Sequence, residues 1–478
     1  MLLAALTSEA GGQAPPYPQS NGSDQAGAAF APPDARPPQT AQPRLAMQPP
    51  SAARSAPVVP APNSQPLYAP RVAGQAPYSY TPMSPPPYPP PSWQPGPYQP
   101  PPNQPALPSS VYEITSKFWF RPDILLWWSK SDPMPQPLVT TGSPADALPG
   151  ALGQPGTQVV YGGNSINFGL TGGLRLETGL WLDDNRRYGL ELGYFFLGMP
   201  WRRFSDWSDG YGSPVIARPT IDAASGTEGS YVDALPGYVS GGVDVITRSQ
   251  FQGANVDGAW NLVQTDGLRF DALLGFRYLS LVESLGIFDE FSEVTPGSIT
   301  FAGAPIRASD VLTDLDHFRL SNSFYGGSLG GRLYLARGRW LITALGKVAL
   351  GTVQQRASIY GSTTLTDWYG NQTVLPGGIL ATTANMGNHY QSPFAVAPEA
   401  HFNVGYQIRP WVTLRVGYSF LFLSNVARPG NQVSRVTSAN LIPTDPAYGT
   451  AGPNQPAFQF HTSSYWAQGL NLGLDFRF

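Results

Sequence analysis

The stretch Trp466–Phe478, WAQGLNLGLDFRF, decides the fold. Its bulky apolar residues share one parity: Trp466, Leu470, Leu472, Leu474, Phe476 and Phe478. The other parity holds small, polar or charged residues, and Gln468 is the one polar residue among the apolar set. Since successive side chains of a β-strand point to opposite faces, this alternation predicts a strand with one apolar face and one polar face.

The same alternation occurs in nine further stretches, more weakly in the fourth, sixth, seventh and eighth of the ten. The predicted strands are 118–128, 166–182, 188–196, 251–264, 268–278, 320–335, 340–355, 394–408, 412–422 and 466–478. No run of apolar residues in the chain reaches the roughly 18 to 20 that a transmembrane helix needs. The sequence therefore predicts an all-β chain.

The connections between these strands alternate in length. Four are short, at 183–186, 265–267, 336–338 and 409–410, and five are long, at about 131–163, 204–242, 285–315, 357–392 and 428–460. Outer-membrane β-barrels have an even number of strands, short turns at one end and long loops at the other. We therefore expect a transmembrane up-and-down antiparallel β-barrel of about ten strands, with twelve as the alternative and with both barrel termini on the short-turn side.

Alternation alone also fits a soluble β-barrel or sandwich whose apolar face is inside. Charged residues interleaved with glycine at mid-strand, long loops at one end and an aromatic last residue favour an apolar face that contacts outer-membrane lipid. About ten residues at ~3.3 Å with a tilt of ~40° span roughly 25 Å, the height of the apolar band of such barrels. The predicted membrane girdles consist of aromatic residues near the strand ends: Phe118, Trp128, Tyr188, Phe196, Tyr278, Trp340, Trp411, Trp466 and Phe478.

The opposite parity predicts the lining of the lumen. Its charged residues nearly cancel in sign: Arg121, Asp123, Arg175, Glu177, Glu191, Arg269, Asp271, Arg277, Arg332, Lys347, Glu399, Arg415, Asp475 and Arg477. Ten strands lie between eight-stranded barrels, which side chains fill, and sixteen-stranded barrels, which hold an aqueous channel. Two functions stay open. The sequence favours a narrow porin-like channel for small solutes with a charge-paired lumen, and the alternative is a closed structural or anchoring barrel that displays long surface loops.

The composition argues against several other classes. A net charge of −3 argues against a nucleic-acid binder, and the absence of cysteine excludes disulfides and a Cys nucleophile. Of His317, His389, His401 and His461, only His401 falls mid-strand on the lumen parity. It lies two residues from Glu399, and we expect it to belong to a network of paired charges. Since no catalytic or metal-binding motif accompanies it, we expect no enzyme activity, cofactor or metal site.

The first 110 residues are predicted to form an arm that has no hydrophobic core. Thirty of the 52 prolines lie within residues 1–108, and the densest part, 83–108, favours extended polyproline II. We expect residues 15–110 to be a disordered Pro-rich arm in the periplasm, a tether that contacts the cell wall or, as the alternative, a ligand for an aromatic-lined groove. Residues 1–14 are read as the remnant of a signal peptide whose start lies upstream; the other reading is that no signal peptide is present.

The barrel region, 111–478, resembles a known family. The stretch Phe118–Trp128, FWFRPDILLWW, resembles the opening strand of the putative β-barrel porin-7 family of planctomycetes, and Gly172–Gly198 is similar to its first hairpin. The resemblance implies a β-barrel region, often after a Pro-rich or Gln-rich leader. Together with the pattern of short turns and long loops, it leads us to expect the bacterial outer membrane, with the long loops extracellular. The last residues are similar to the C-terminal signal that the outer-membrane insertion machinery reads, which implies that machinery as a partner through Phe478.

Overall fold

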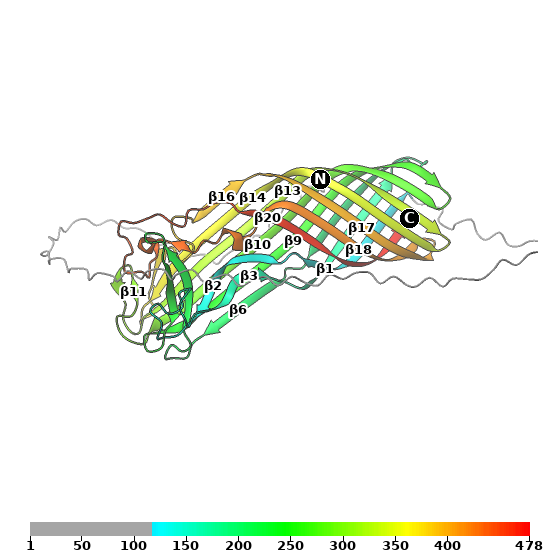
Figure 1. Cartoon of the computed structure of the whole chain (residues 1–478). Coiled ribbons are helices and arrows are strands. Elements are labelled where there is room, and N and C mark those ends of the chain that lie inside the picture. The colour runs from blue at the N-terminus through cyan, green and yellow to red at the C-terminus, as the bar shows by residue number, and fades with distance from the viewer. Residues whose placement is uncertain (1–116) are drawn as a thin grey trace, which may run out of the picture. The chain divides into compact units, whose positions relative to one another are not determined.

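The computed structural model describes residues 117–478. The predicted signal-peptide remnant and the whole of the predicted Pro-rich arm fall on residues 1–116, outside the described residues. In the described part, ten antiparallel strands close into a ring (Figure 1). In ring order they are β1 (Phe118–Ser129), β4 (Leu170–Trp181), β5 (Tyr188–Leu197), β9 (Val239–Thr265), β10 (Leu268–Glu293), β13 (Val311–Arg337), β14 (Trp340–Thr366), β17 (Phe394–Arg409), β18 (Val412–Ala427) and β20 (Thr462–Arg477).

The ring closes where β20 pairs with β1. Backbone hydrogen bonds join Phe118 and Phe478 in both directions, with N–O distances of 3.3 and 2.9 Å. The four tight turns between β4 and β5, β9 and β10, β13 and β14, and β17 and β18 lie at the same end, which we call the short-turn end. The opposite end is the long-loop end. The up-and-down barrel of ten strands is therefore confirmed, and the alternative of twelve strands is wrong.

Four adjacent ring strands are longer than the pattern predicts. β9, β10, β13 and β14 contain 26 or 27 residues, whereas β1 and β4 contain 12. The prediction that 204–242, 285–315 and 357–392 are loops is wrong where these residues continue the strands. The reason lies on the outward face, because beyond Tyr278 and Tyr325 polar residues such as Ser280, Ser284 and Ser323 interrupt the apolar residues. The apolar alternation ends there, although the backbone ladder continues.

The other long-loop segments also contain strands. A five-stranded sheet has the order β19–β7–β2–β3, with β8 beside β7. Its strands are β2 (Asp132–Thr141), β3 (Gln158–Ile166), β7 (Ile216–Asp222), β8 (Glu228–Ala234) and β19 (Val436–Thr437). The shorter elements are β6 (Trp201–Trp207), β11 (Thr300–Phe301), β12 (Ala304–Pro305), β15 (Gln372–Pro376), β16 (Gly387–Gln391), α1 (Pro429–Gln432) and the 3-10 turn Ala439–Leu441. The described residues contain no helix long and apolar enough to cross a membrane.

The apolar face of the ring points outward. In β10, Leu274 is 70% exposed, whereas Asp271, which has the other parity, is fully buried. The predicted outward direction of the apolar face is therefore confirmed. Aromatic pairs lie near both ends of this face, Trp340 with Tyr406 toward the short turns and Tyr278 with Tyr325 toward the long loops. Eight of the nine predicted girdle residues have the outward parity, whereas Trp411 lies exposed in the turn before β18. Their contact with lipid stays a prediction.

Candidate functional site

The inward side chains nearest the short-turn end form a layer of ion pairs. Arg332 of β13 donates to both carboxylate oxygens of Glu191 on β5, at 2.5 and 2.6 Å. Arg121 of β1 lies 3.3 Å from Asp475 of β20 and donates to the Tyr334 hydroxyl at 3.2 Å. All five side chains are buried. The contacts of Arg332 with Glu191 and of Arg121 with Tyr334 join strands that are not neighbours, so the layer extends across the barrel interior.

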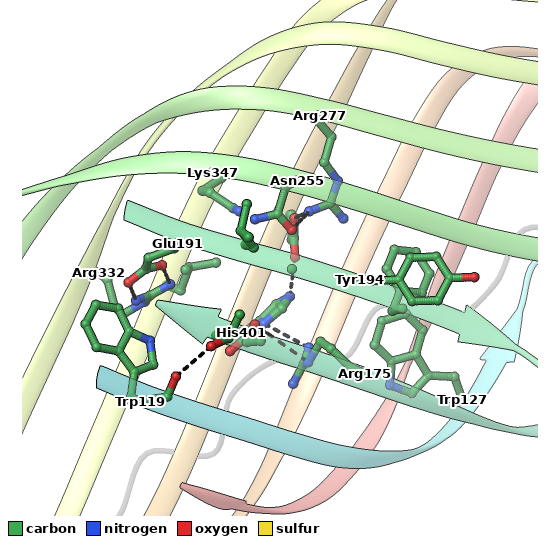
Figure 2. A pocket seen from close by; sticks show the side chains of 17 residues that line it. Trp119, Trp127, Arg175, Glu191, Tyr194, Asn255, Arg277, Arg332, Lys347 and His401 are labelled. Carbon is green, nitrogen blue, oxygen red and sulfur yellow. Dashed lines mark hydrogen bonds and ion pairs between the residues drawn. The ribbon is translucent and has the colours of Figure 1, made fainter. Parts of the chain in front are cut away.

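A second group of charges continues this layer toward the middle of the barrel. Asp123 of β1 accepts from Arg175 of β4 and from Arg415 of β18, each at 2.7 Å. Glu399 of β17 lies 2.7 Å from Arg277 of β10 and 2.6 Å from His401. Figure 2 shows Arg175, Arg277 and His401 converging from different strands on one narrow space. The lumen is thus bridged by side chains at this level.

The remaining predicted lumen charges are paired as well. Arg269 contacts Asp271 at 2.5 Å, Lys347 contacts Asp257 at 3.0 Å, and Arg477 contacts Asp475 at 2.9 Å. Glu177 lies 3.8 Å from Arg175 and 3.9 Å from Arg121. All fourteen predicted lumen residues therefore take part in buried ion pairs, which form one group around Arg121, Arg175 and Asp123 and several separate pairs such as Arg269–Asp271.

Little free space remains within this network. A cavity of about 20 Å³ lies among residues that include Arg175, Glu191, Arg277 and Lys347. A volume of that size holds about one water molecule. Charges taken out of water are stable only when they are paired and hydrogen-bonded, and removing one partner of such a pair costs roughly 3–5 kcal/mol. The geometry is that of a packed polar core.

A layer of apolar side chains lies above the ion pairs, toward the long-loop end. Trp127 contacts Phe195, Phe195 contacts Phe251, and Phe251 contacts Tyr465, with ring-centroid distances of 4.9 to 5.8 Å. Trp127 donates from Nε1 to Asn471 at 2.9 Å. These side chains are 4% exposed or less. They belong to a buried cluster that also takes aliphatic residues from other ring strands, so the interior is filled at this level too.

Residues 119–478 match the model of the family described as putative beta barrel porin-7 (BBP7). The chain belongs to this family. Accordingly, this BBP7 chain is an outer-membrane β-barrel, in agreement with the resemblance of its first strands. No curated protein matches the chain.

The similarity of this chain to solved structures is low. The outer membrane protease OmpT from Escherichia coli is 7% identical, with a TM-score of 0.35, over 76% of this chain and 97% of that one. A Pseudomonas aeruginosa FadL homologue is 8% identical, with a TM-score of 0.20, over 77% and 93%. The P. putida toluene transporter TodX is 9% identical, with a TM-score of 0.16, over 76% and 90%.

At the long-loop end of the BBP7 barrel, Arg218 of β7 binds the inner face of the long strands. It contacts Asp289 of β10 at 2.5 Å and Asp316 of β13 at 3.2 Å, and all three side chains are 1% exposed. Burial raises the pKa of Asp289 to about 7, and the charge of Asp316 adds to the shift. Burial and neighbouring carboxylates also raise the pKa of Asp233 and of Asp314 well above the ordinary value. The single guanidinium of Arg218 thus lies near four buried carboxyl groups.

A second arginine fastens the segment that follows β18. Arg428 donates to both carboxylate oxygens of Glu283 on β10, at 2.6 and 2.8 Å, and lies 3.5 Å from Asp132 of β2. Burial, with the Glu283 charge, raises the pKa of Asp132 to about 8. Apolar residues of β2, β7 and the 377–381 segment pack with inward residues of the long strands in one buried cluster. The long-loop end is therefore filled by the chain's own loops.

The sequence alone missed these long-loop contacts. Arg218, Asp233, Asp132 and Arg428 lie in stretches that the pattern assigned to loops. The apolar layer, in contrast, could be predicted from the sequence. Two stretches are apolar on both parities, Leu125–Trp128, LLWW, and Tyr194–Leu197, YFFL. Apolar side chains on both faces of a barrel strand indicate an interior that is apolar and packed at that depth.

His401 lies inside the charge layer of the BBP7 barrel. Its Nδ1 atom is 3.0 Å from an Arg175 nitrogen, and its Nε2 atom is 2.6 Å from Glu399. Both ring nitrogens are therefore occupied by charged neighbours, as the paired-network prediction requires. Within residues 117–478, no group of three or more His, Asp or Glu side chains is placed to hold a metal ion.

Proposed function

We propose that this barrel is closed and structural, and that it is an outer-membrane anchor. It displays a folded cap at its long-loop end, which consists of the sheet of β2, β3, β7, β8 and β19 and the side chains packed with it. The observation that carries the proposal is the filled interior. Paired charges, an apolar aromatic layer and the cap cluster follow one another along the barrel. This is the second of the two functions that the sequence left open.

The narrow solute channel that the sequence favours remains the competing function. It requires bridging pairs such as Arg332–Glu191 and Arg277–Glu399 to separate, and also requires the rings of Trp127 and Phe251 to move aside. Separating a buried ion pair without new partners is strongly unfavourable. No enzyme activity is proposed, since His401 is held by Arg175 and Glu399.

Single-channel conductance of the refolded full chain in planar bilayers tests the proposal. We expect no unitary steps from the wild type, and lower thermal stability without conductance from the Arg269→Ala/Arg277→Ala variant. In an open pore the same variant would conduct and would shift toward cation selectivity, because it removes fixed positive charge. Steady cation-selective steps from the variant, together with wild-type conductance, would overturn the closed barrel.

We further propose that the long-loop end is extracellular and that the arm at residues 15–110 is periplasmic, where it contacts the cell wall. Short turns face the periplasm in barrels of this kind. The terminal Phe478 is 65% exposed on the outward face, which suits recognition by the insertion machinery. Deleting residues 15–105 should leave a heat-modifiable barrel that no longer cosediments with isolated cell wall. Cosedimentation equal to that of the full chain would contradict the tether.

A further inference from the structure

Three exposed arginines lie on the outward face of the long strands, beyond the apolar band. In the pairing register, Arg248 of β9 and Arg319 of β13 flank Ser284 of β10 in a single row. Arg356 of β14 lies in the next row toward the short-turn end and stacks near Tyr390, with its guanidinium 5.8 Å from the ring centroid. The outward face therefore changes from apolar to cationic within a few residues of the Tyr278–Tyr325 pair.

Between Arg248 and Arg319 the outward side chains of β10 are short, so the surface of the sheet lies below the two guanidinium groups. Ser284 and Gly286 of β10 carry a small side chain or none, and the two flanking strands lie about 10 Å apart. His317, the register partner of Gly286, borders the same surface. Burial and the charges of Arg319 and Arg248 lower the pKa of His317, so the three groups are close to one another.

Neither guanidinium of this row is satisfied by another group within residues 117–478. Across residues 117–478, Arg248 and Arg319 have no hydrogen-bond or ion-pair partner, in contrast to the lumen arginines. Arginine presents a planar fork of donors that binds phosphate oxygens through two parallel hydrogen bonds. Two unpaired forks on either side of a low surface therefore suit a phosphate group.

The distance of this row from the apolar band limits which kind of molecule can place a phosphate there. Six residues separate Tyr325 from Arg319, which corresponds to roughly 15 Å along the membrane normal at ~3.3 Å per residue and a tilt of ~40°. A phospholipid headgroup layer is only about 5–7 Å thick. Apart from Val282, the outward residues in between are polar and can hydrogen-bond hydroxyl groups, among them Gln252, Ser280, Ser323 and Gln354.

We propose that Arg248 and Arg319 bind the phosphate groups of a glycolipid, whose sugar headgroup lies on the polar residues between this row and the tyrosines. The long-loop orientation proposed above makes the lipid a component of the outer leaflet. A phosphate carried on a sugar headgroup reaches the height of the row, whereas the phosphate of an ordinary phospholipid falls short of it. The site lies on one side of the barrel, where the four long strands continue beyond the apolar band.

Flotation with lipid vesicles tests the site on the refolded full chain. The probe is phosphatidylcholine vesicles that contain a bisphosphorylated acylated glucosamine disaccharide, and the comparison vesicles contain the same glycolipid without phosphates or, separately, phosphatidylglycerol. We expect the wild type to prefer the phosphorylated glycolipid, and Arg248→Gln/Arg319→Gln to lose that preference by about tenfold. The matched control is Arg337→Gln/Arg409→Gln, which removes two exposed arginines at the short-turn end and should keep the preference.

Heat-modifiable migration on a gel verifies that each variant is folded. Equal preference in the wild type and the folded Arg248→Gln/Arg319→Gln variant would overturn the site. Equal binding to phosphatidylglycerol would overturn the requirement for a sugar headgroup, and competition by inorganic phosphate at the same concentration would assign the site to a free anion. Conductance is not involved in any of these measurements, so the result is independent of whether the barrel is closed.

Discussion

Arg332 of β13 and Glu191 of β5 bind each other through two hydrogen bonds inside the barrel, although β9 and β10 separate their strands. The pair spans part of the lumen rather than one wall. Its position explains why charges of both signs recur at mid-strand on the inward parity. A ten-stranded ring is narrow enough for an arginine from one side to reach a carboxylate on another.

Removing one member of this pair should be costly. Arg332→Met leaves Glu191 buried without its partner, and we expect the free energy of unfolding to fall by about 3–5 kcal/mol. Arg332→Met/Glu191→Leu should recover most of the loss, since an apolar pair replaces the ions. Urea titration of refolded protein in micelles measures both. If the single variant is as stable as the wild type, the lumen at this level is water-filled.

Inward glycines make room for the charges. A Cβ atom at Gly473 of β20 would overlap the Asp123 carboxylate, which bridges Arg175 and Arg415. We expect Gly473→Ala to destabilise the barrel by about 2–4 kcal/mol, because the bridge must open. The control is Gly346→Ala on the outward face, where a Cβ meets no atom within 4 Å. Equal unfolding midpoints for the two variants would contradict this packing.

The contacts of Arg218 predict a pH dependence at the long-loop end. The pKa of Asp289 is about 7 when folded, and the pKa values of Asp233 and Asp314 are raised further. Because unfolded aspartate titrates near 4, the folded cap binds protons more tightly than the unfolded cap. Its stability is therefore full below about pH 4 and declines as the pH rises through about 7.

Hydrogen exchange of β7 and β8, corrected for the intrinsic rate at each pH, measures this decline. Protection should be lower at pH 8 than at pH 5, and Asp289→Asn should flatten the dependence. Protection that increases with pH would mean that these carboxyl groups are solvated. Exchange in β1, which lies outside this cluster, is the internal control.

The orientation predicts where a protease can cut intact cells. The turn at 367–371 projects from the long-loop end, with Tyr369 72% exposed. A protease site inserted there should be cleaved from outside, whereas the same site in the 183–187 turn should be cleaved only after the outer membrane is permeabilised. External cleavage at 183–187 would reverse the topology.

The sequence predicts the ring well and the cap poorly. Alternation places each ring strand and the inward parity of residues such as Arg175 and Asp475, because lipid on one side and a crowded lumen on the other constrain every second residue. In the long strands beyond Tyr278, polar residues such as Ser280 and Ser284 stand on the outward face, and the apolar constraint is lost. Arg218 and Arg428 bind partners on distant strands, and no local pattern encodes such contacts.

The seam between β1 and β20 has a consequence for assembly. These strands are the first and last of the ring, so their ladder is the contact of greatest sequence separation in the barrel. Until it forms, a sheet that extends from β1 to β20 has two open edges with unpaired backbone groups, and such edges aggregate. A chain that lacks β20 cannot remove these edges, so a barrel in which only this seam is weakened should accumulate as a periplasmic aggregate rather than as a leaky membrane protein.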